Sequence, residues 1–291
     1  MDNKISYEEQ AVICRAHSAI VKLFNKTNES VGSGVLIKLG QKYFIATAAH
    51  VIPEKHSIEI VPVPGKSPIH RFQLRGACEK NDVGFLELLP GDENNLRDEA
   101  FTECACMAST IDLTSEYDVL VVGYPVDYHF ETQSQETICD ASTFRTIIIP
   151  QKKWPKLTEI DPERPINKNT DIFLDYDPLN GVIGFPTNES SLDLVHHPDS
   201  TPPKPEGMSG GGIWSYSGKT LKNSGIWSPG SYLLGIETSF FSKKKLMRGV
   251  RISAWCDLIR SHYPKEETVI EALNNIAKNE YPPKDAKKVI G

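Results

Sequence analysis

The sequence predicts a protein built mainly from β-strands, with helices near its two ends. Runs rich in β-branched and aromatic residues recur along the chain, and short turns containing glycine or proline separate them. With 291 residues, of which 39% are hydrophobic, the chain can bury a substantial core and suits one large β domain with extensions. The predicted strands are 18–24, 31–37, 43–50, 83–88, 117–122, 143–149, 171–176 and 233–240.

The connections between these strands differ in kind. Segment 7–14 predicts a short helix that leads into the first strand. Segment 31–50 predicts a hairpin, because two apolar runs flank the turn Leu39-Gly40-Gln41-Lys42. Segments 150–170 and 186–206 are polar, rich in proline and longer than a hairpin needs. We expect these two connections to be mobile or to carry regulation.

Two helices are predicted near the carboxyl terminus. The first, 253–262, begins at Ser253, a residue suited to the N-cap. The second, 266–278, has one apolar face, which suits core packing or the docking of a partner. The apolar positions are Ile252, Trp255, Cys256 and Ile259 for the first helix and Val269, Leu273 and Ile276 for the second.

A serine surrounded by glycines is the clearest functional signal. Ser209 lies in the segment Gly207-Met208-Ser209-Gly210-Gly211-Gly212. A serine hydroxyl becomes a good nucleophile when an imidazole accepts its proton and a buried carboxylate fixes that imidazole. The small neighbours also let backbone N–H groups converge on one point, as an oxyanion hole requires. By itself this segment would also fit a plain glycine-rich loop.

A histidine and an aspartate precede this serine in positions that suit the same chemistry. His50 ends the hairpin in Thr47-Ala48-Ala49-His50, and Asp82 begins the apolar strand 83–88. A lone histidine after a strand is usually a loop residue, and an aspartate before a strand usually forms a turn. The rival aspartates are Asp112, Asp118 and Asp127, and the remaining histidines, expected at the surface or behind the site, are His17, His56, His70, His129, His196, His197 and His262.

The segments around His50, Asp82 and Ser209, in that order, resemble those of the trypsin/chymotrypsin-like serine peptidases. The resemblance implies an all-β fold of two six-stranded antiparallel β-barrels with a C-terminal helical extension. It also implies that these residues form a Ser-His-Asp catalytic triad and that the N–H groups of Gly207 and Ser209 form the oxyanion hole. Gly207 would then need a backbone conformation that a side chain makes costly.

Within this family the chain looks closer to the bacterial Deg/HtrA-like and related peptidases than to members that are secreted as zymogens and activated by cleavage before an Ile or Val. No Ile-Val-Gly-Gly-like start precedes the His50 hairpin, and too little chain follows the last helix for a PDZ domain. The predicted division is a peptidase domain at 1–263, with barrels at 18–107 and 117–241 and a closing helix at 253–262, followed by a helical extension at 264–291.

The strand after Ser209 resembles the strand that pairs with the substrate backbone and forms one wall of the specificity pocket. The predicted substrate contacts are therefore Glu237, Thr238, Ser239 and Phe240, together with Pro203, which replaces the aspartate of relatives that cut after Arg or Lys. Glu237 could accept a substrate Arg or Lys through a charge-assisted hydrogen bond. Strand alternation could instead turn Glu237 away, and Phe240 could narrow the pocket to small apolar side chains.

Composition excludes several other classes of function. A formal net charge of -6 gives no basic footprint for nucleic acid, and no apolar run suits a secretory signal or a membrane span. The six cysteines have no paired spacing, and Cys104-Ala105-Cys106 lacks the further ligands of a zinc site. There is no P-loop or dinucleotide fingerprint. We therefore expect a cytoplasmic protein with reduced thiols that uses no cofactor or metal and contacts no membrane.

The sequence thus predicts a regulated bacterial serine endopeptidase that acts on protein or peptide substrates. By analogy of organisation, it resembles proteases encoded beside defence or cell-death modules, where a regulatory or companion protein is expected. The alternative is a catalytically silent, protease-fold module that binds peptides. An esterase of the α/β-hydrolase type is disfavoured, because there the serine precedes the aspartate and histidine in the chain.

Overall fold

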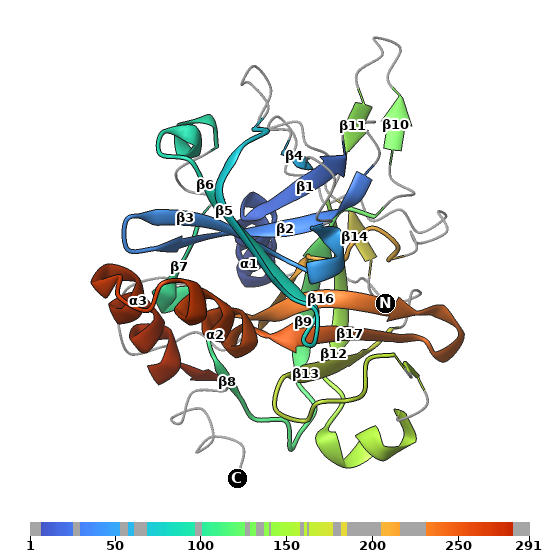
Figure 1. Cartoon of the computed structure of the whole chain (residues 1–291). Coiled ribbons are helices and arrows are strands. Elements are labelled where there is room, and N and C mark those ends of the chain that lie inside the picture. The colour runs from blue at the N-terminus through green and yellow to red at the C-terminus, as the bar shows by residue number, and fades with distance from the viewer. Residues whose placement is uncertain are drawn as a thin grey trace.

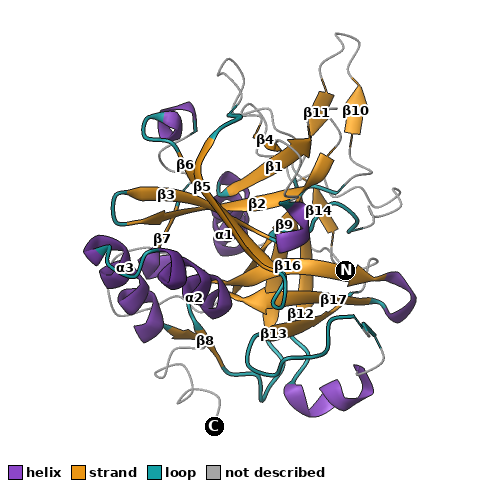
Figure 2. Ribbon diagram, viewed as in Figure 1, coloured by secondary structure: helices purple, strands orange, loops and turns teal. Residues whose placement is uncertain are grey.

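The protein consists of two β-barrels flanked by helices (Figures 1 and 2). The computed structural model describes residues 7–25, 30–52, 58–60, 69–96, 101–125, 129–131, 137–139, 141–157, 160–161, 163–176, 182–184, 205–215 and 231–281. Strands of the first barrel occupy the upper half of Figure 1, and those of the second barrel occupy the lower half. In the described part of the chain no helix is long and apolar enough to cross a membrane.

The first barrel has six strands in the order β4-β1-β2-β3-β6-β5. All neighbouring pairs are antiparallel, and the sheet closes where Ile60 at the end of β4 pairs with Ile69 before β5. Both backbone hydrogen bonds of that pair form, at 3.0 and 3.1 Å. The strands are β1 (Ile20–Asn25), β2 (Ser30–Leu39), β3 (Lys42–Thr47), β4 (Ile58–Ile60), β5 (Phe72–Cys78) and β6 (Val83–Leu88), and a seventh strand, β7 (Thr102–Glu103), is added parallel to β2.

The second barrel has six strands in the order β13-β17-β16-β15-β9-β12 and closes through the pairing of Ile148, after β12, with Leu174 on β13. The strands are β9 (Asp118–Gly123), β12 (Ser142–Ile147), β13 (Asp171–Asp175), β15 (Gly212–Ser215), β16 (Leu233–Phe241) and β17 (Leu246–Arg251), and β14 (Val182–Gly184) is added to the edge of β12. The two six-stranded antiparallel barrels confirm the predicted fold class. The predicted limit of the second barrel at residue 241 is too early, because β17 forms a hairpin with β16.

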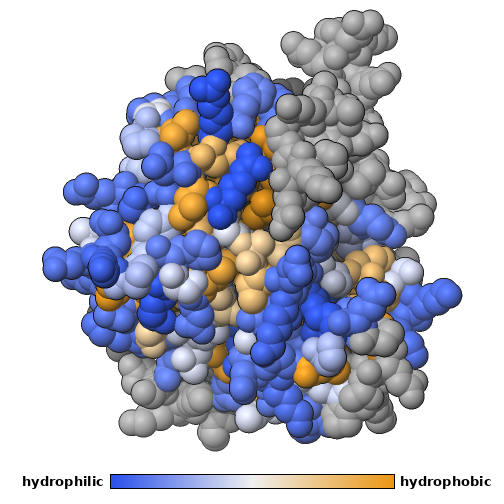
Figure 3. Space-filling model, in the orientation of Figure 1, coloured by the Kyte–Doolittle hydropathy of each residue, from blue (hydrophilic) through white to orange (hydrophobic). Residues whose placement is uncertain are grey.

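In the first barrel, successive apolar side chains of a strand point alternately into two different cores. On β2, Leu36 points into the first barrel, whereas Val35 and Ile37 point outward to a core shared with the helices and the second barrel. That shared core also includes Trp214 and Trp255. A third core fills the second barrel. The outer surface is largely polar on the face shown in Figure 3, with smaller apolar patches between the polar side chains.

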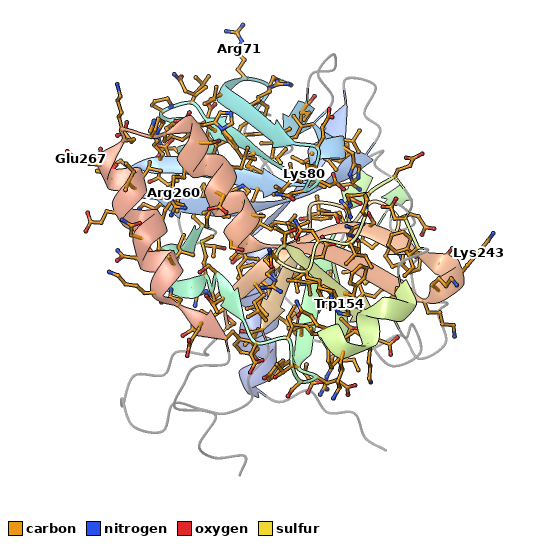
Figure 4. The ribbon with its side chains drawn as sticks, turned by 60° about the horizontal axis from the view of Figure 1, so that its bottom comes forward. Arg71, Lys80, Trp154, Lys243, Arg260 and Glu267 are labelled. Atoms are coloured by element: carbon orange, nitrogen blue, oxygen red, sulfur yellow. The ribbon has the colours of Figure 1, made fainter. Side chains whose placement is uncertain are left out.

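Helices α1 (Tyr7–Ser18), α2 (Ile252–His262) and α3 (Glu267–Lys278) supply much of the shared core. The predicted lead-in helix was too short, since α1 continues to Ser18 and β1 begins at Ile20. Ser253 is not an N-cap: Arg251, the last residue of β17, occupies that position in extended conformation and α2 starts directly after it. Figure 4 shows α2 and α3 side by side, with Arg260 and Glu267 on their outer surfaces.

The remaining elements are short. Strands β8 (Thr110–Ile111) and β18 (Glu280–Tyr281) pair in parallel, and β10 (His129–Glu131) pairs with β11 (Thr137–Cys139). Short 3₁₀-helices are η1 (Ala49–Val51), η2 (Asp92–Asn95), η4 (Cys104–Cys106), η5 (Gln151–Leu157) and η6 (Ser242–Lys244). Lys243, on η6, lies at the tip of the hairpin formed by β16 and β17 (Figure 4).

Candidate active site

His50 projects from a turn of 3₁₀-helix that follows the second strand of the predicted hairpin. β3 ends at Thr47, and η1 begins two residues later, so the chain bends sharply before His50. Ala49 and Val51 on either side are buried, which anchors the turn in the first barrel. The His50 side chain is 52% exposed. The imidazole is therefore exposed at the surface of the barrel, while the backbone that carries it is anchored by its buried neighbours.

Asp82 holds this imidazole on one side. Its carboxylate oxygen Oδ1 lies 2.9 Å from His50 Nδ1 and accepts the His50 backbone N–H at 3.2 Å. Asp82 has a φ of 52°, in the left-handed region that Asp and Asn tolerate better than other residues with side chains. Because an ionised carboxylate can only accept, Nδ1 carries the proton and Nε2 of a neutral ring is left as the acceptor.

The Ser209 loop begins with a tight turn. Met208 N–H donates to Pro205 C=O at 2.9 Å, and Gly207, third in the turn, has a φ of 90°, as in a type II turn. Among the described residues, the N–H groups of Met208, Gly210 and Gly211 all donate backbone hydrogen bonds, whereas those of Gly207 and Ser209 donate none.

The first barrel holds this loop through Ser33 on β2. The Ser33 N–H donates to Ser209 C=O at 2.8 Å, and its hydroxyl donates to Gly207 C=O at 3.2 Å while accepting from Tyr124 N–H at 2.9 Å. Gly210 has a φ of 93°, and a Cβ there would lie 1.9 Å from the Ser33 carbonyl oxygen. Only glycine allows the loop to approach β2 this closely.

The Ser209 hydroxyl is not engaged with the imidazole in this structure. Its Oγ donates to Thr238 C=O at 3.4 Å, and in the described part of the chain it makes no hydrogen bond to His50. Hydrogen bonds of this kind are often long or absent without substrate and tighten when substrate binds.

A cluster of buried charges lies behind Asp82. Arg164 donates to Asp82 Oδ2 at 2.5 Å, and Arg248 donates to Asp171 Oδ2 at 2.7 Å. Asp161 lies near both arginines, 3.9 Å from Arg164 Nε and 3.4 Å from Arg248. Burial, and then the neighbouring Arg248, lowers the pKa of the Arg164 guanidinium, but arginine remains protonated at physiological pH. Neither Arg164 nor Arg248 was predicted from the sequence as part of the site. The signal that could have pointed to Arg164 was its position between Pro162 and Pro165.

Glu237 belongs to the interior beside this cluster and not to a substrate pocket. Its residue exposure is 1%, and neither carboxylate oxygen has a hydrogen-bond partner among the described residues. Burial, and then the negative charge of Asp82, raises the pKa of Glu237 to about 8, although Arg164 and the Ser239 backbone act in the opposite direction. Strand alternation has turned this side chain inward, and its burial contradicts the predicted contact with a substrate.

The other predicted substrate contacts have different surroundings. Thr238 is buried and donates to Arg248 C=O, so only its backbone carbonyl faces Ser209. Ser239 and Phe240 are partly exposed, and the Phe240 ring packs edge-on against Tyr176 at 4.7 Å. Pro203 lies outside the described residues. Within the described segments no group of His, Cys, Asp and Glu side chains is arranged to hold a metal ion.

The two closed barrels, with His50 and Asp82 on the first and Ser209 on the second, define the double-barrel architecture of the trypsin-like serine proteases. No protein-family model matches the chain, and no curated protein matches it.

Solved structures with a similar fold were found. Neuropsin, a serine protease expressed in the limbic system of mouse brain, is 14% identical with a TM-score of 0.46, over 85% of this chain and 95% of that one. The HtrA-type protease AlgW with tripeptide is 15% identical with a TM-score of 0.48, over 88% of this chain and 63% of that one. An inactive serine-to-alanine mutant of Rv3671c from M. tuberculosis is 14% identical with a TM-score of 0.45, over 91% and 97%.

Proposed function

We propose that this protein is a serine endopeptidase that cleaves protein or peptide substrates through an acyl-enzyme. One observation supports the proposal: Asp82 contacts His50 Nδ1 and is joined through Arg164 to Thr238, whose carbonyl accepts from the Ser209 hydroxyl. In the Ser209 loop, the N–H groups of Gly207 and Ser209 donate no backbone hydrogen bond to the described residues. Nucleophile, general base, orienting carboxylate and oxyanion donors are the four roles that acyl transfer requires.

The chemistry assigned to these residues runs in two halves. Ser209 Oγ rotates away from Thr238 C=O, attacks the scissile carbonyl carbon and passes its proton to His50 Nε2. The oxyanion is bound by the N–H groups of Gly207 and Ser209, and the C–N bond then breaks as His50 returns the proton to the departing amine. Water next attacks the ester carbon and gives a proton to His50, and Ser209 leaves with that proton as the acid is released.

Asp82 contributes without taking the proton. By accepting from Nδ1 it keeps Nε2 free to act as the base, and its charge stabilises the imidazolium that forms at each step. We further propose, on sequence grounds alone, that the enzyme is a regulated cytoplasmic bacterial protease of the kind found beside defence or cell-death modules, with a companion protein as substrate or regulator. The genes that flank its coding sequence test this setting.

A serine-reactive fluorophosphonate probe tests the activity directly. We expect the wild-type protein to be labelled once per chain, at Ser209, and the labelling to disappear in Ser209→Ala. His50→Ala should slow labelling by at least about a hundredfold, because the hydroxyl loses its base. His70→Ala, which removes an exposed histidine of the same barrel, is the control and should label normally. A wild-type protein that folds but is not labelled would instead identify the catalytically silent peptide-binding module.

A further inference from the structure

Arg164 makes three side-chain contacts that join the two halves of the site. Its guanidinium donates to Asp82 Oδ2 at 2.5 Å, to Thr238 Oγ1 at 2.8 Å and to Ser239 Oγ at 3.2 Å. Arg164 comes from the connection before β13 in the second barrel, whereas Asp82 belongs to the first barrel. One side chain therefore links the carboxylate that holds His50 to the strand that flanks Ser209.

The backbone that carries Arg164 is itself firmly held. Arg248, a fully buried residue of β17, donates to Arg164 C=O at 2.6 Å and to Pro165 C=O at 3.1 Å. Asp161 accepts the Arg164 backbone N–H at 3.1 Å. Arg248 is in turn paired with Asp171 on β13. The guanidinium thus extends from a fixed point, and a contact from a fixed point can orient its partner.

We propose that Arg164 is a positioning residue that clamps the Asp82 carboxylate against His50 and ties it to Thr238 and Ser239 on β16. Both oxygens of Asp82 face His50 Nδ1, Oδ1 at 2.9 Å and Oδ2 at 3.1 Å; Oδ1 also accepts the His50 backbone N–H, and Oδ2 also accepts from Arg164. Without the contact to Arg164 the carboxylate could rotate about its Cβ–Cγ bond and leave Nδ1. This inference rests on the proposed peptidase function.

The positive charge of Arg164 also offsets part of the negative charge of Asp82 beside His50. Arg164 faces Asp82, Asp161, Asp171 and Arg248, while Asp82 faces His50, Arg164 and the buried Glu237. A guanidinium on Oδ2 offsets part of the negative charge that favours a protonated imidazole. Its removal therefore makes it easier for His50 to hold a proton, and the imidazole should lose that proton at a higher pH.

Two substitutions separate the geometric effect from the charge. Arg164→Met removes both the charge and the hydrogen bonds, whereas Arg164→Lys keeps the charge but cannot donate to Asp82, Thr238 and Ser239 from one planar group. Arg260→Met removes an exposed arginine of α2 and is the control. The first readout is steady-state kinetics on a peptide substrate across pH, and the second is the NMR titration of the His50 ring in proteins that also carry Ser209→Ala.

We expect Arg164→Met to lower kcat roughly 10- to 100-fold, as for a misplaced catalytic group, with a smaller change in KM. The acidic limb of its kcat/KM profile and the NMR titration of its His50 ring should both move to higher pH, because Asp82 loses the guanidinium that offsets its charge. Arg164→Lys should keep the wild-type titration but not the wild-type kcat. Either a wild-type kcat or an unmoved His50 titration in Arg164→Met overturns the clamp.

The NMR titration needs no turnover, so the two proposals can fail separately. Absence of probe labelling in the wild-type protein refutes the peptidase, whereas an unmoved His50 titration refutes the role of Arg164. If Arg164→Met does not fold, Arg164→Lys still decides the geometric part: wild-type kcat in that variant refutes it.

Discussion

Glu237 gives the sharpest quantitative prediction, because a buried carboxyl whose pKa changes on folding makes stability depend on pH. The pKa of this group is raised from 4.5 to about 8 on folding, chiefly by burial. Between these two values the folded protein binds more protons than the unfolded chain, so the free energy of unfolding falls as the pH rises. The free-energy cost of burying the charged Glu237 carboxylate is absent at a pH well below 4.5 and fully present at a pH well above 8.

The size of the effect follows from about 1.36 kcal/mol for each unit of pKa displacement. On this basis the Glu237 carboxyl costs about 3 kcal/mol at pH 7 and approaches about 5 kcal/mol above pH 8. Glu237→Gln has nearly the same shape but does not titrate. Relative to its parent, the variant should gain about 3 to 4 kcal/mol between pH 5 and pH 8, whatever constant cost the buried amide adds.

Urea denaturation at pH 5, 6, 7 and 8 measures this gain, with Ser209→Ala in both proteins to prevent self-digestion. Glu271→Gln, which removes an exposed glutamate of α3, is the matched control and should follow its parent at every pH. If the Glu237→Gln and parent curves stay parallel from pH 5 to pH 8, Glu237 is not a buried proton acceptor and the reasoning is refuted.

Two further predictions concern the loop that carries Ser209. Gly210→Ala should destabilise the protein by more than about 3 kcal/mol and abolish probe labelling, because the added Cβ would overlap the Ser33 carbonyl. Gly91→Ala is the control: Gly91 has a similar φ of 97° but open space around it, so the substitution should cost only about 1 to 2 kcal/mol. Equal thermal shifts for the two variants would contradict this. Ser33→Ala should lower stability by about 1 to 3 kcal/mol and slow probe labelling, because it removes the hydroxyl that bridges Gly207 and Tyr124. If the variant has normal stability and normal labelling, the bridge is not needed.

Local patterns were enough to predict the histidine hairpin, whereas the two barrels were expected from the resemblance to the peptidase family. Segment 31–50 consists of two apolar runs on either side of a turn in which Gly40 has a φ of 59°, so local chemistry and tertiary packing agree. The segments around His50, Asp82 and Ser209 are likewise short stretches of chain. Helix boundaries were less accurate, because α2 starts directly from β17 and needs no capping side chain.

The electrostatic part of the site could not be predicted in the same way. Arg164 and Asp82 are 82 positions apart, and nothing near either residue indicates the other. For Glu237 the sequence left two possibilities open, a contact with substrate or a side chain turned away by strand alternation, and its burial agrees with the second. The contact between Arg164 and Asp82 forms only when the two barrels pack together, since each barrel supplies one of its residues.

The contacts that complete the site also fix when it can appear during synthesis. Gly210 N–H donates to Glu237 C=O on β16, and Arg164 is held by Arg248 on β17, the last barrel strand in the chain. A chain still growing on the ribosome carries His50, Asp82 and Ser209 long before these strands emerge. Because β17 holds the backbone of Arg164 and β16 holds that of Gly210, the contacts around His50 and Ser209 cannot form before β17 has been synthesised. The order of translation therefore places the assembly of this site after the synthesis of both strands.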